Sequence, residues 1–208
     1  MSKADNMPLN LIITGVGGQG NVLASQIIGK AVVKKGFRVT IGETFGLSQR
    51  GGAVMSHVRI SKNKNCGPLV PPNMANIVIG LEPLETLRVL AEYGNRDALF
   101  LVNSRPIYPL NVIAGEVEYP DADWIKDTLL KSVKKLYWMD GTAKAIELGG
   151  PIMLNMIMLG ALCTIKNFPI TVDDLKGAIK NIFPDSKLKA NYMAINVGSG
   201  IISVESKS

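Results

Sequence analysis

Residues 9–20, LNLIITGVGGQG, place a short apolar run directly before a glycine-rich turn. The apolar run from Leu9 to Thr14 predicts a buried strand, and the spacing of apolar residues from Val22 to Val33 predicts a helix after the turn. A second apolar run, from Phe37 to Ile41, predicts another strand. The opening segment therefore predicts a β-α-β unit with a parallel, right-handed crossover.

The remainder of the chain continues the alternation of strands and helices. Further strands are predicted at Val54 to Ile60, Asn76 to Leu81, Leu99 to Asn103 and Leu136 to Met139, with a short edge strand at Val117 to Tyr119. Helices are predicted at Pro83 to Tyr93, Ala122 to Val133, Pro151 to Ile165, Thr171 to about Phe183 and Ala190 to Val197, followed by a frayed tail from Gly198 to Ser208. This pattern predicts one α/β domain over residues 1–208, with a core at about 9–198. We expect a Rossmann-like, three-layer fold with a mostly parallel sheet, helices on both faces and a helical C-terminal part.

Composition limits the classes of function. The net charge is +6, but the basic residues are dispersed and aromatic residues make up only 6%, which argues against a nucleic-acid groove and weakly for an anionic ligand or acidic partner. Two cysteines, Cys66 and Cys163, and one histidine, His57, cannot form a four-cysteine iron-sulfur site or a Cys/His zinc site. Because the apolar runs are too short for a signal peptide or a membrane span, we expect a cytoplasmic protein without a membrane partner.

The first glycine-rich turn has the G-x-G-x-x-G spacing at Gly15, Gly17 and Gly20. Such a turn lets backbone N–H groups approach a phosphate at the start of the following helix. Gln19 would place an amide at the crest of the turn, and Glu43 stands near the position of an acid that binds a ribose hydroxyl. The alternative is a tight strand-to-helix turn without a ligand, and the residues alone leave both open.

A second glycine-rich segment, Gln49-Arg50-Gly51-Gly52, ends a long connection between two predicted strands. Arg50 suits a phosphate, a carboxylate or a partner protein. An internal ion pair between Glu43 and Arg50 is the alternative.

Several stretches together resemble one protein family: GVGGQG at 15–20, GLSQRGG at 46–52, SHVR at 56–59, GLEPLE at 80–85, VNSRPIYP at 102–109 and NMIMLGAL at 155–162. They are similar to the gamma-type module of 2-oxoacid:ferredoxin oxidoreductases, and the last two stretches are most similar to beta subunits of the indolepyruvate branch. The resemblance covers about residues 9–198.

The resemblance implies a divided enzyme. A partner alpha subunit would hold thiamine diphosphate and the iron-sulfur clusters, while this chain, holding no cofactor alone, would complete the complex and help to form the site for coenzyme A. The reaction would be oxidative decarboxylation of an aryl pyruvate to an aryl-acetyl-CoA, with electrons passing to ferredoxin. The resemblance assigns ligand binding to Gly15, Gly17, Gly18, Gln19 and Gly20 in the first segment, and to Gln49, Arg50, Gly51 and Gly52 in the second. No catalytic or metal-binding residue is assigned.

One position departs from the family pattern, because Asn76 stands where relatives often have aspartate. An asparagine there can still cap or turn the backbone. Three other functions remain open: a gamma subunit for another 2-oxoacid (pyruvate, 2-oxoglutarate or 2-oxoisovalerate), a free-standing dinucleotide-dependent dehydrogenase, and an interaction module whose glycine segments bind no small molecule. Roles for Cys66 and His57 are not indicated by the sequence.

Overall fold

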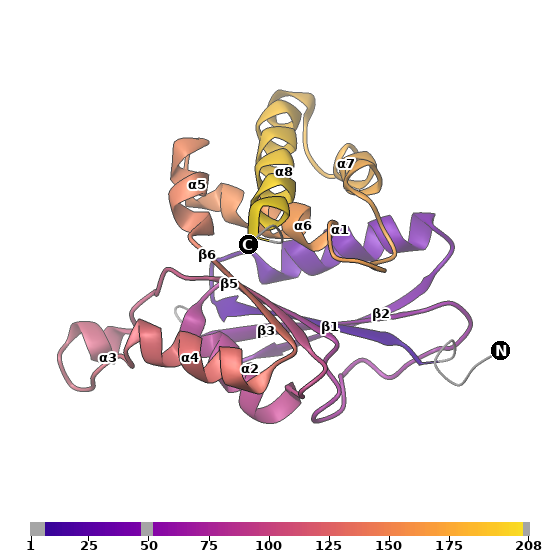
Figure 1. Cartoon of the computed structure of the whole chain (residues 1–208). Coiled ribbons are helices and arrows are strands. Elements are labelled where there is room, and N and C mark those ends of the chain that lie inside the picture. Colours follow the sequence, from indigo (N-terminus) through magenta and orange to yellow (C-terminus); the bar gives the residue numbers. More distant parts are fainter. Residues whose placement is uncertain (1–6, 47–51, 206–208) are drawn as a thin grey trace.

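A mixed sheet with the strand order β2-β3-β1-β4-β5-β6 forms the centre of the computed structural model, which describes residues 7–46 and 52–205 (Figure 1). The strands are β1 (Leu9–Val16), β2 (Arg38–Phe45), β3 (Ala53–Ser61), β4 (Ile77–Gly80), β5 (Leu99–Asn103) and β6 (Lys135–Met139). Strands β1, β4, β5 and β6 are parallel, and β3 runs antiparallel to both β1 and β2. The α/β class and the mostly parallel sheet are thus confirmed, while β3 separates the two strands of the predicted β-α-β unit.

Helices cover both faces of this sheet (Figure 1). They are α1 (Asn21–Lys34), α2 (Pro83–Tyr93), α3 (Leu110–Ile113), α4 (Ala122–Ser132), α5 (Gly141–Glu147), α6 (Leu154–Leu162), α7 (Val172–Ile179) and α8 (Asp185–Glu205), with a 3-10 turn at Pro151–Met153. One hydrophobic core packs α1 and α5 to α8 on one face, and a second packs α2 and α4 on the other. In the described residues, no helix is long and apolar enough to cross a membrane.

Local sequence explains where several helices begin. Helix α2 starts with Pro83 at its first position and is capped by Glu82, whose side chain accepts a hydrogen bond from the Glu85 N–H. Helix α7 starts with a capping box in which Thr171 and Asp174 exchange hydrogen bonds. These starts agree with the sequence-based predictions.

The C-terminal segment corrects one prediction. The predicted tail from Gly198 is wrong, because α8 continues through Gly198 to Glu205, and it also starts before the predicted Ala190. A Cβ atom added at Gly198 would lie 1.8 Å from the Ile157 carbonyl oxygen, and one added at Gly160 would lie 2.1 Å from that of Ile195. The two glycines therefore let α6 and α8 pack backbone against backbone, and this contact holds the last turns in place.

Three shorter predictions also need correction. Residues Val117 to Tyr119 form no strand, and the Tyr119 hydroxyl instead binds the Glu82 carboxylate. The apolar helix predicted from Pro151 to Ile165 is divided into the 3-10 turn and α6, which ends at Leu162. Helix α7 ends at Ile179, where the N–H groups of Ile182 and Phe183 turn back onto the Ile179 carbonyl.

Asn76 lies at the start of β4 and joins it to its neighbour. Its side-chain oxygen accepts a hydrogen bond from the Asn10 N–H at 2.8 Å, and its own N–H donates to the Asn10 carbonyl at 2.9 Å. The asparagine therefore pairs with backbone, as expected from its type.

Candidate functional site

The topological switch point of the sheet lies at the carboxyl ends of β1 and β4. The chain leaves β1 for α1 on one face of the sheet and leaves β4 for α2 on the other face (Figure 1). Ligands of open α/β sheets bind at such a switch point, outside the carboxyl ends of the strands. The first glycine-rich turn forms one side of this position, and Leu81 and Glu82 form the other.

Backbone geometry explains the glycines of the first turn. Gly18 and Gly20 have positive φ angles of 96° and 79°, and a Cβ atom at Gly20 would lie 2.4 Å from the Asn155 Nδ2 atom. At Gly15, a Cβ atom would lie 2.4 Å from the Gln19 Oε1 atom. The side chains of Gln19 and Asn155 therefore occupy the space that a Cβ atom at Gly15 or Gly20 would need.

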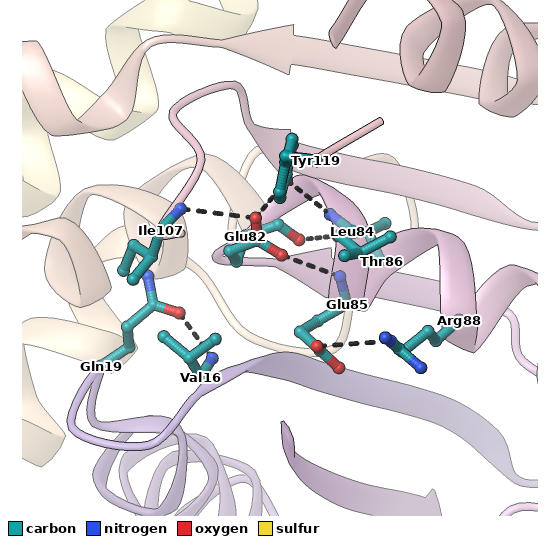
Figure 2. Close-up of polar contacts among 9 residues, drawn as sticks. All are labelled: Val16, Gln19, Glu82, Leu84, Glu85, Thr86, Arg88, Ile107 and Tyr119. Carbon is teal, nitrogen blue, oxygen red and sulfur yellow. Dashed lines mark hydrogen bonds and ion pairs between the residues drawn. The ribbon is translucent and has the colours of Figure 1, made fainter. Parts of the chain in front are cut away.

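Gln19 lies inside the turn and not at its crest. Its Oε1 atom accepts a hydrogen bond from the Val16 N–H at 2.8 Å (Figure 2), and its Nε2 atom donates to the Leu81 carbonyl at 2.9 Å. The side-chain amide thus bridges the ends of β1 and β4. Its predicted position at the crest is wrong, because both of its polar atoms bind the protein interior.

Backbone donors remain at the start of α1. Across residues 7–46 and 52–205, no acceptor is found for the N–H groups of Gly18, Gly20 and Asn21. Helix α1 has 14 residues and no side-chain cap, so its positive end and these donors face the switch point together. This arrangement suits a phosphate or another anion.

Two buried asparagines supply acceptors beside these donors. Asn21 donates its amide to the Val54 carbonyl, and Asn155 in α6 donates its amide to the Gln19 carbonyl at 2.6 Å. Asn21 is 2% exposed and Asn155 is 6% exposed, yet the side-chain oxygen of each has no hydrogen-bond partner within the described part of the chain. Buried acceptors without partners are costly, and a ligand N–H or O–H would satisfy them.

The second glycine-rich segment meets the first at one described position. The Gly17 N–H donates to the Gly52 carbonyl at 2.9 Å, and Gly52 directly precedes β3, which pairs with β2. Gln49, Arg50 and Gly51 lie outside the described residues. The structure therefore brings Gly52 to the first turn, and the ligand-binding role of the whole segment stays a prediction.

A buried carboxylate on the other side of the switch point joins three chain segments (Figure 2). Glu82 is 1% exposed, and its Oε2 atom accepts from the Glu85 N–H at 2.8 Å. Its Oε1 atom accepts from the Tyr119 hydroxyl and from the Ile107 N–H. Glu82 therefore anchors both ends of the connection between β5 and α4.

Burial dominates the electrostatics of this cluster. Desolvation raises the pKa of Glu82, although the hydrogen bonds from Tyr119 and the backbone oppose the shift. Desolvation likewise raises the pKa of Glu85, despite its ion pair with Arg88 at 3.4 Å. The pKa of Tyr119 is raised by burial and by its hydrogen bond to Glu82. Sequence reasoning did not assign these residues, although Glu82 followed by Pro83 is a typical start of a helix.

Glu43 does not lie where a dinucleotide-binding acid would. Strand β3 lies between β2 and β1, so Glu43 is displaced from the switch point. Its carboxylate accepts hydrogen bonds from the hydroxyls of Ser25 and Ser56, both fully buried. The expected contact with a ribose is therefore replaced by an internal structural role.

His57 and the cysteines lie apart from the switch point. His57 is fully buried, its Nδ1 atom accepts from the Val70 N–H, and its ring packs edge-on against Tyr93. Burial lowers the pKa of His57, and the charge of Arg59 adds to this effect while that of Glu92 opposes it. Cys163 has its pKa raised to about 12 by burial, which disfavours the reactive thiolate.

Comparison with protein families gives one match over nearly the whole chain. Residues 10–201 match the family described as pyruvate ferredoxin/flavodoxin oxidoreductase. The chain is 35% identical to indolepyruvate oxidoreductase subunit IorB of Pyrococcus horikoshii, over 91% of this chain and 93% of that one. It is 34% identical to the IorB subunit of Archaeoglobus fulgidus, over 92% and 94%. Similarity to 2-oxoglutarate synthase subunit KorC of Methanothermobacter thermautotrophicus is lower, at 28% identity over 91% and 93%.

Solved structures share the fold at lower identity. Pyruvate oxidoreductase subunit PORC of Thermotoga maritima matches with a TM-score of 0.68 and 20% identity, over 92% of this chain and 95% of that chain. The 2-oxoglutarate:ferredoxin oxidoreductase of Magnetococcus marinus matches with a TM-score of 0.75 and 20% identity. That match covers 95% of this chain and 31% of the longer one, whose structure has 2-oxoglutarate, coenzyme A and succinyl-CoA bound.

Proposed function

The chain belongs to the pyruvate ferredoxin/flavodoxin oxidoreductase family, and from this premise we propose that it is the beta subunit of an indolepyruvate oxidoreductase. It is a subunit of a 2-oxoacid:ferredoxin oxidoreductase. Sequence identity favours the aryl pyruvate branch. Four relatives with 32–35% identity are IorB subunits, while the KorC and PorC relatives reach 28%.

The proposed complex divides its chemistry between chains. It decarboxylates an aryl pyruvate, transfers the remaining acyl group to the coenzyme A thiol and passes the electrons to ferredoxin. We propose that the alpha subunit holds thiamine diphosphate and the iron-sulfur clusters. The present chain completes that complex in the cytoplasm and contributes residues to the coenzyme A site.

The geometry at the start of α1 supports the role in binding coenzyme A. The uncapped N–H groups of Gly18, Gly20 and Asn21 suit its diphosphate. The buried acceptors of Asn21 and Asn155 suit its hydroxyl and amide donors. The combination of donors for an anion with unpartnered buried acceptors is the observation that carries this proposal.

Gly18 offers a sharp test of this role. It is exposed, and a Cβ atom there meets nothing within 4 Å, but its φ of 96° strains any side chain, so the test compares two residues of similar shape at this same position. Gly18→Asp would place a carboxylate at the start of α1, and Gly18→Asn is its matched neutral control with nearly the same shape. In the co-expressed complex, we expect the aspartate variant to raise the KM for coenzyme A about tenfold more than the asparagine variant does, at equal assembly, because the added charge repels a phosphate. Equal KM values for the two variants would exclude a phosphate at this position.

Substrate class is tested separately with the same complex. We expect CoA-dependent reduction of a viologen dye to be faster with indolepyruvate than with pyruvate, 2-oxoglutarate or 2-oxoisovalerate at equal concentration. The purified chain alone should show no such activity. Faster turnover of an aliphatic 2-oxoacid would assign the chain to another branch of the family.

Arg50→Ala separates a ligand contact from a subunit contact. Loss of co-purification with the alpha subunit would indicate that the second glycine-rich segment is an interface. Intact assembly with a raised KM for coenzyme A would indicate a contact with the substrate. For a charge-assisted contact with phosphate, we expect a cost of about 1.5 to 3 kcal/mol.

A further inference from the structure

An apolar groove lies beside the edge strand β2, on the face of the sheet that α1 and α7 cover. The groove has a volume of about 570 Å³, and its floor and walls come from β2, α1 and α7. Val39 and Ile41 of β2 line it together with Gly29 and Val33 of α1. Gly29 brings α1 close to β2, since a Cβ atom there would lie 2.9 Å from the Ile41 Cδ1 atom.

Strand β2 leaves its outer edge open beside this groove. It is the terminal strand of the sheet, and its 8 residues contain no proline or lysine. Its one basic residue, Arg38, stands at the first position and donates to the Asn65 side chain. Among the described residues, no backbone group pairs with β2 from the outer side. A chain that paired with this edge would turn every second side chain toward the groove, because side chains alternate between the faces of a strand.

The positive charge beside the groove favours a partner segment that carries acidic residues. Lys30 and Lys34 line the groove, and none of its described lining residues is acidic. The Lys34 ammonium also donates a hydrogen bond to the Gly177 carbonyl of α7 at 3.2 Å, which holds its charge beside the groove. Glu43, the one carboxylate of β2, has both oxygens bound by the Ser25 and Ser56 hydroxyls. Two copies of this chain joined edge to edge would place the lysines of one α1 beside those of the other, and like charges at that distance oppose association.

We propose that this edge binds an extended segment of another protein that has an apolar middle and an acidic end. The segment pairs its backbone with β2, inserts alternate apolar side chains between α1 and α7, and places one acidic end near Lys30 and Lys34, which lie one helical turn apart on α1. This surface is separate from the carboxyl end of β1, so it does not depend on the proposed coenzyme A site.

Fluorescence anisotropy of the full chain with defined peptides tests this proposal. The probe is a labelled peptide of sequence Asp-Asp-Val-Thr-Val-Thr-Val-Asp-Asp, which brings one acidic end to the lysines in either strand direction. Its charge control carries lysine at the four aspartate positions. We expect the acidic peptide to bind, the control to bind about tenfold more weakly, and the difference to shrink in high salt. Equal binding of the two peptides, or none by the acidic one, would overturn the proposal.

Variants of the chain locate the binding. The double variant Lys30→Glu, Lys34→Glu should reverse the preference between the two peptides. Lys126→Glu with Lys131→Glu is the matched control, because these exposed lysines lie on α4 on the other face of the sheet. A similar loss in both double variants would indicate general attraction to a basic protein and contradict a specific site.

Backbone methylation tests strand pairing without changing charge. One acidic peptide is N-methylated at its valines and another at its threonines. Since only alternate N–H groups of an added strand face β2, we expect one of the two to lose binding and the other to retain it. Retention by both would exclude pairing with the edge. A stable dimer of the unliganded chain that the acidic peptide separates into monomers would show that a second copy occupies the edge instead.

Discussion

Gly198 in α8 lies directly against the Ile157 carbonyl of α6, so closely that a Cβ atom would come within 1.8 Å of the oxygen. Ile195, one turn earlier in α8, makes the reciprocal contact with Gly160 of α6. The two helices therefore touch through their backbones. Because α6 also carries Asn155, this contact helps to position the residue that holds the first glycine-rich turn.

Gly198→Ala should destabilise the fold. The added methyl group must push α8 away from α6, and we expect a loss of about 1 to 3 kcal/mol in the free energy of unfolding in urea. Gly200→Ala is the matched control, because it lies in the same helix and a Cβ atom there meets nothing within 4 Å. That change should be neutral or stabilise by up to about 1 kcal/mol through helix propensity. A neutral effect at Gly198 would show that the helices separate at little cost.

Gln19→Ala should destabilise the switch point. It removes the acceptor of the Val16 N–H and one donor to the Leu81 carbonyl, although Asn103 still donates to that carbonyl. We expect a loss of about 1 to 3 kcal/mol, the range for leaving a buried polar group without its partner. Gln26→Ala, at an exposed position of α1, should change the stability by less than about 0.5 kcal/mol. A comparable small effect at Gln19 would mean that solvent replaces its bonds.

Glu82 should make stability fall as the pH rises. Burial raises its pKa above the ordinary value of 4.5, so the folded chain binds its proton more tightly than the unfolded chain. Its contribution to stability is therefore complete below the unfolded pKa and is lost as the pH rises through the folded pKa. Unfolding titrations should show a steeper decrease in this window for the native chain than for Glu82→Gln.

Tyr119→Phe provides the companion measurement. The Tyr119 hydroxyl donates to Glu82 and lowers the pKa of that carboxyl, so its removal should raise the pKa further and move the pH window upward. A window that stays in place would show that burial and the backbone donors set the pKa of Glu82 without the tyrosine.

Glu43→Ala should affect stability and not coenzyme A binding. It leaves the buried Ser56 hydroxyl without its acceptor, while Ser25 keeps the Val22 carbonyl. We expect a loss of about 1 to 3 kcal/mol in unfolding free energy. The KM for coenzyme A in the assembled complex should remain unchanged, and a marked increase would place Glu43 in the ligand site after all.

Patterns with a local cause were predictable from the chain. Apolar runs and glycine stops located β1, α1, β4, α2 and β5 closely, because burial of one face dictates the spacing of apolar residues. The family resemblance identified the oxidoreductase subunit through motifs spread over most of the chain, and the comparisons agree. Those motifs also assigned ligand binding to both glycine-rich segments, and this assignment stays a prediction.

Contacts between distant segments were not predictable in the same way. Strand β3 lies between β1 and β2 by pairing with both, and this displaces Glu43 from the ligand position that its sequence spacing suggested. Gln19 turns inward because Leu81, 62 residues later, offers it a carbonyl. The last helix extends past Gly198 because α6 packs against it.

The sequence by itself determined the α/β class, most of the strands and helices, and the family, since each depends on local periodicity or on a motif. Only the tertiary structure decided the strand order, the inward direction of Gln19 and the burial of Glu82. Those features depend on which backbone groups from remote segments meet at the ends of β1 and β4. Such hydrogen bonds leave no periodic pattern in the chain, because a single donor and acceptor can be any distance apart in sequence.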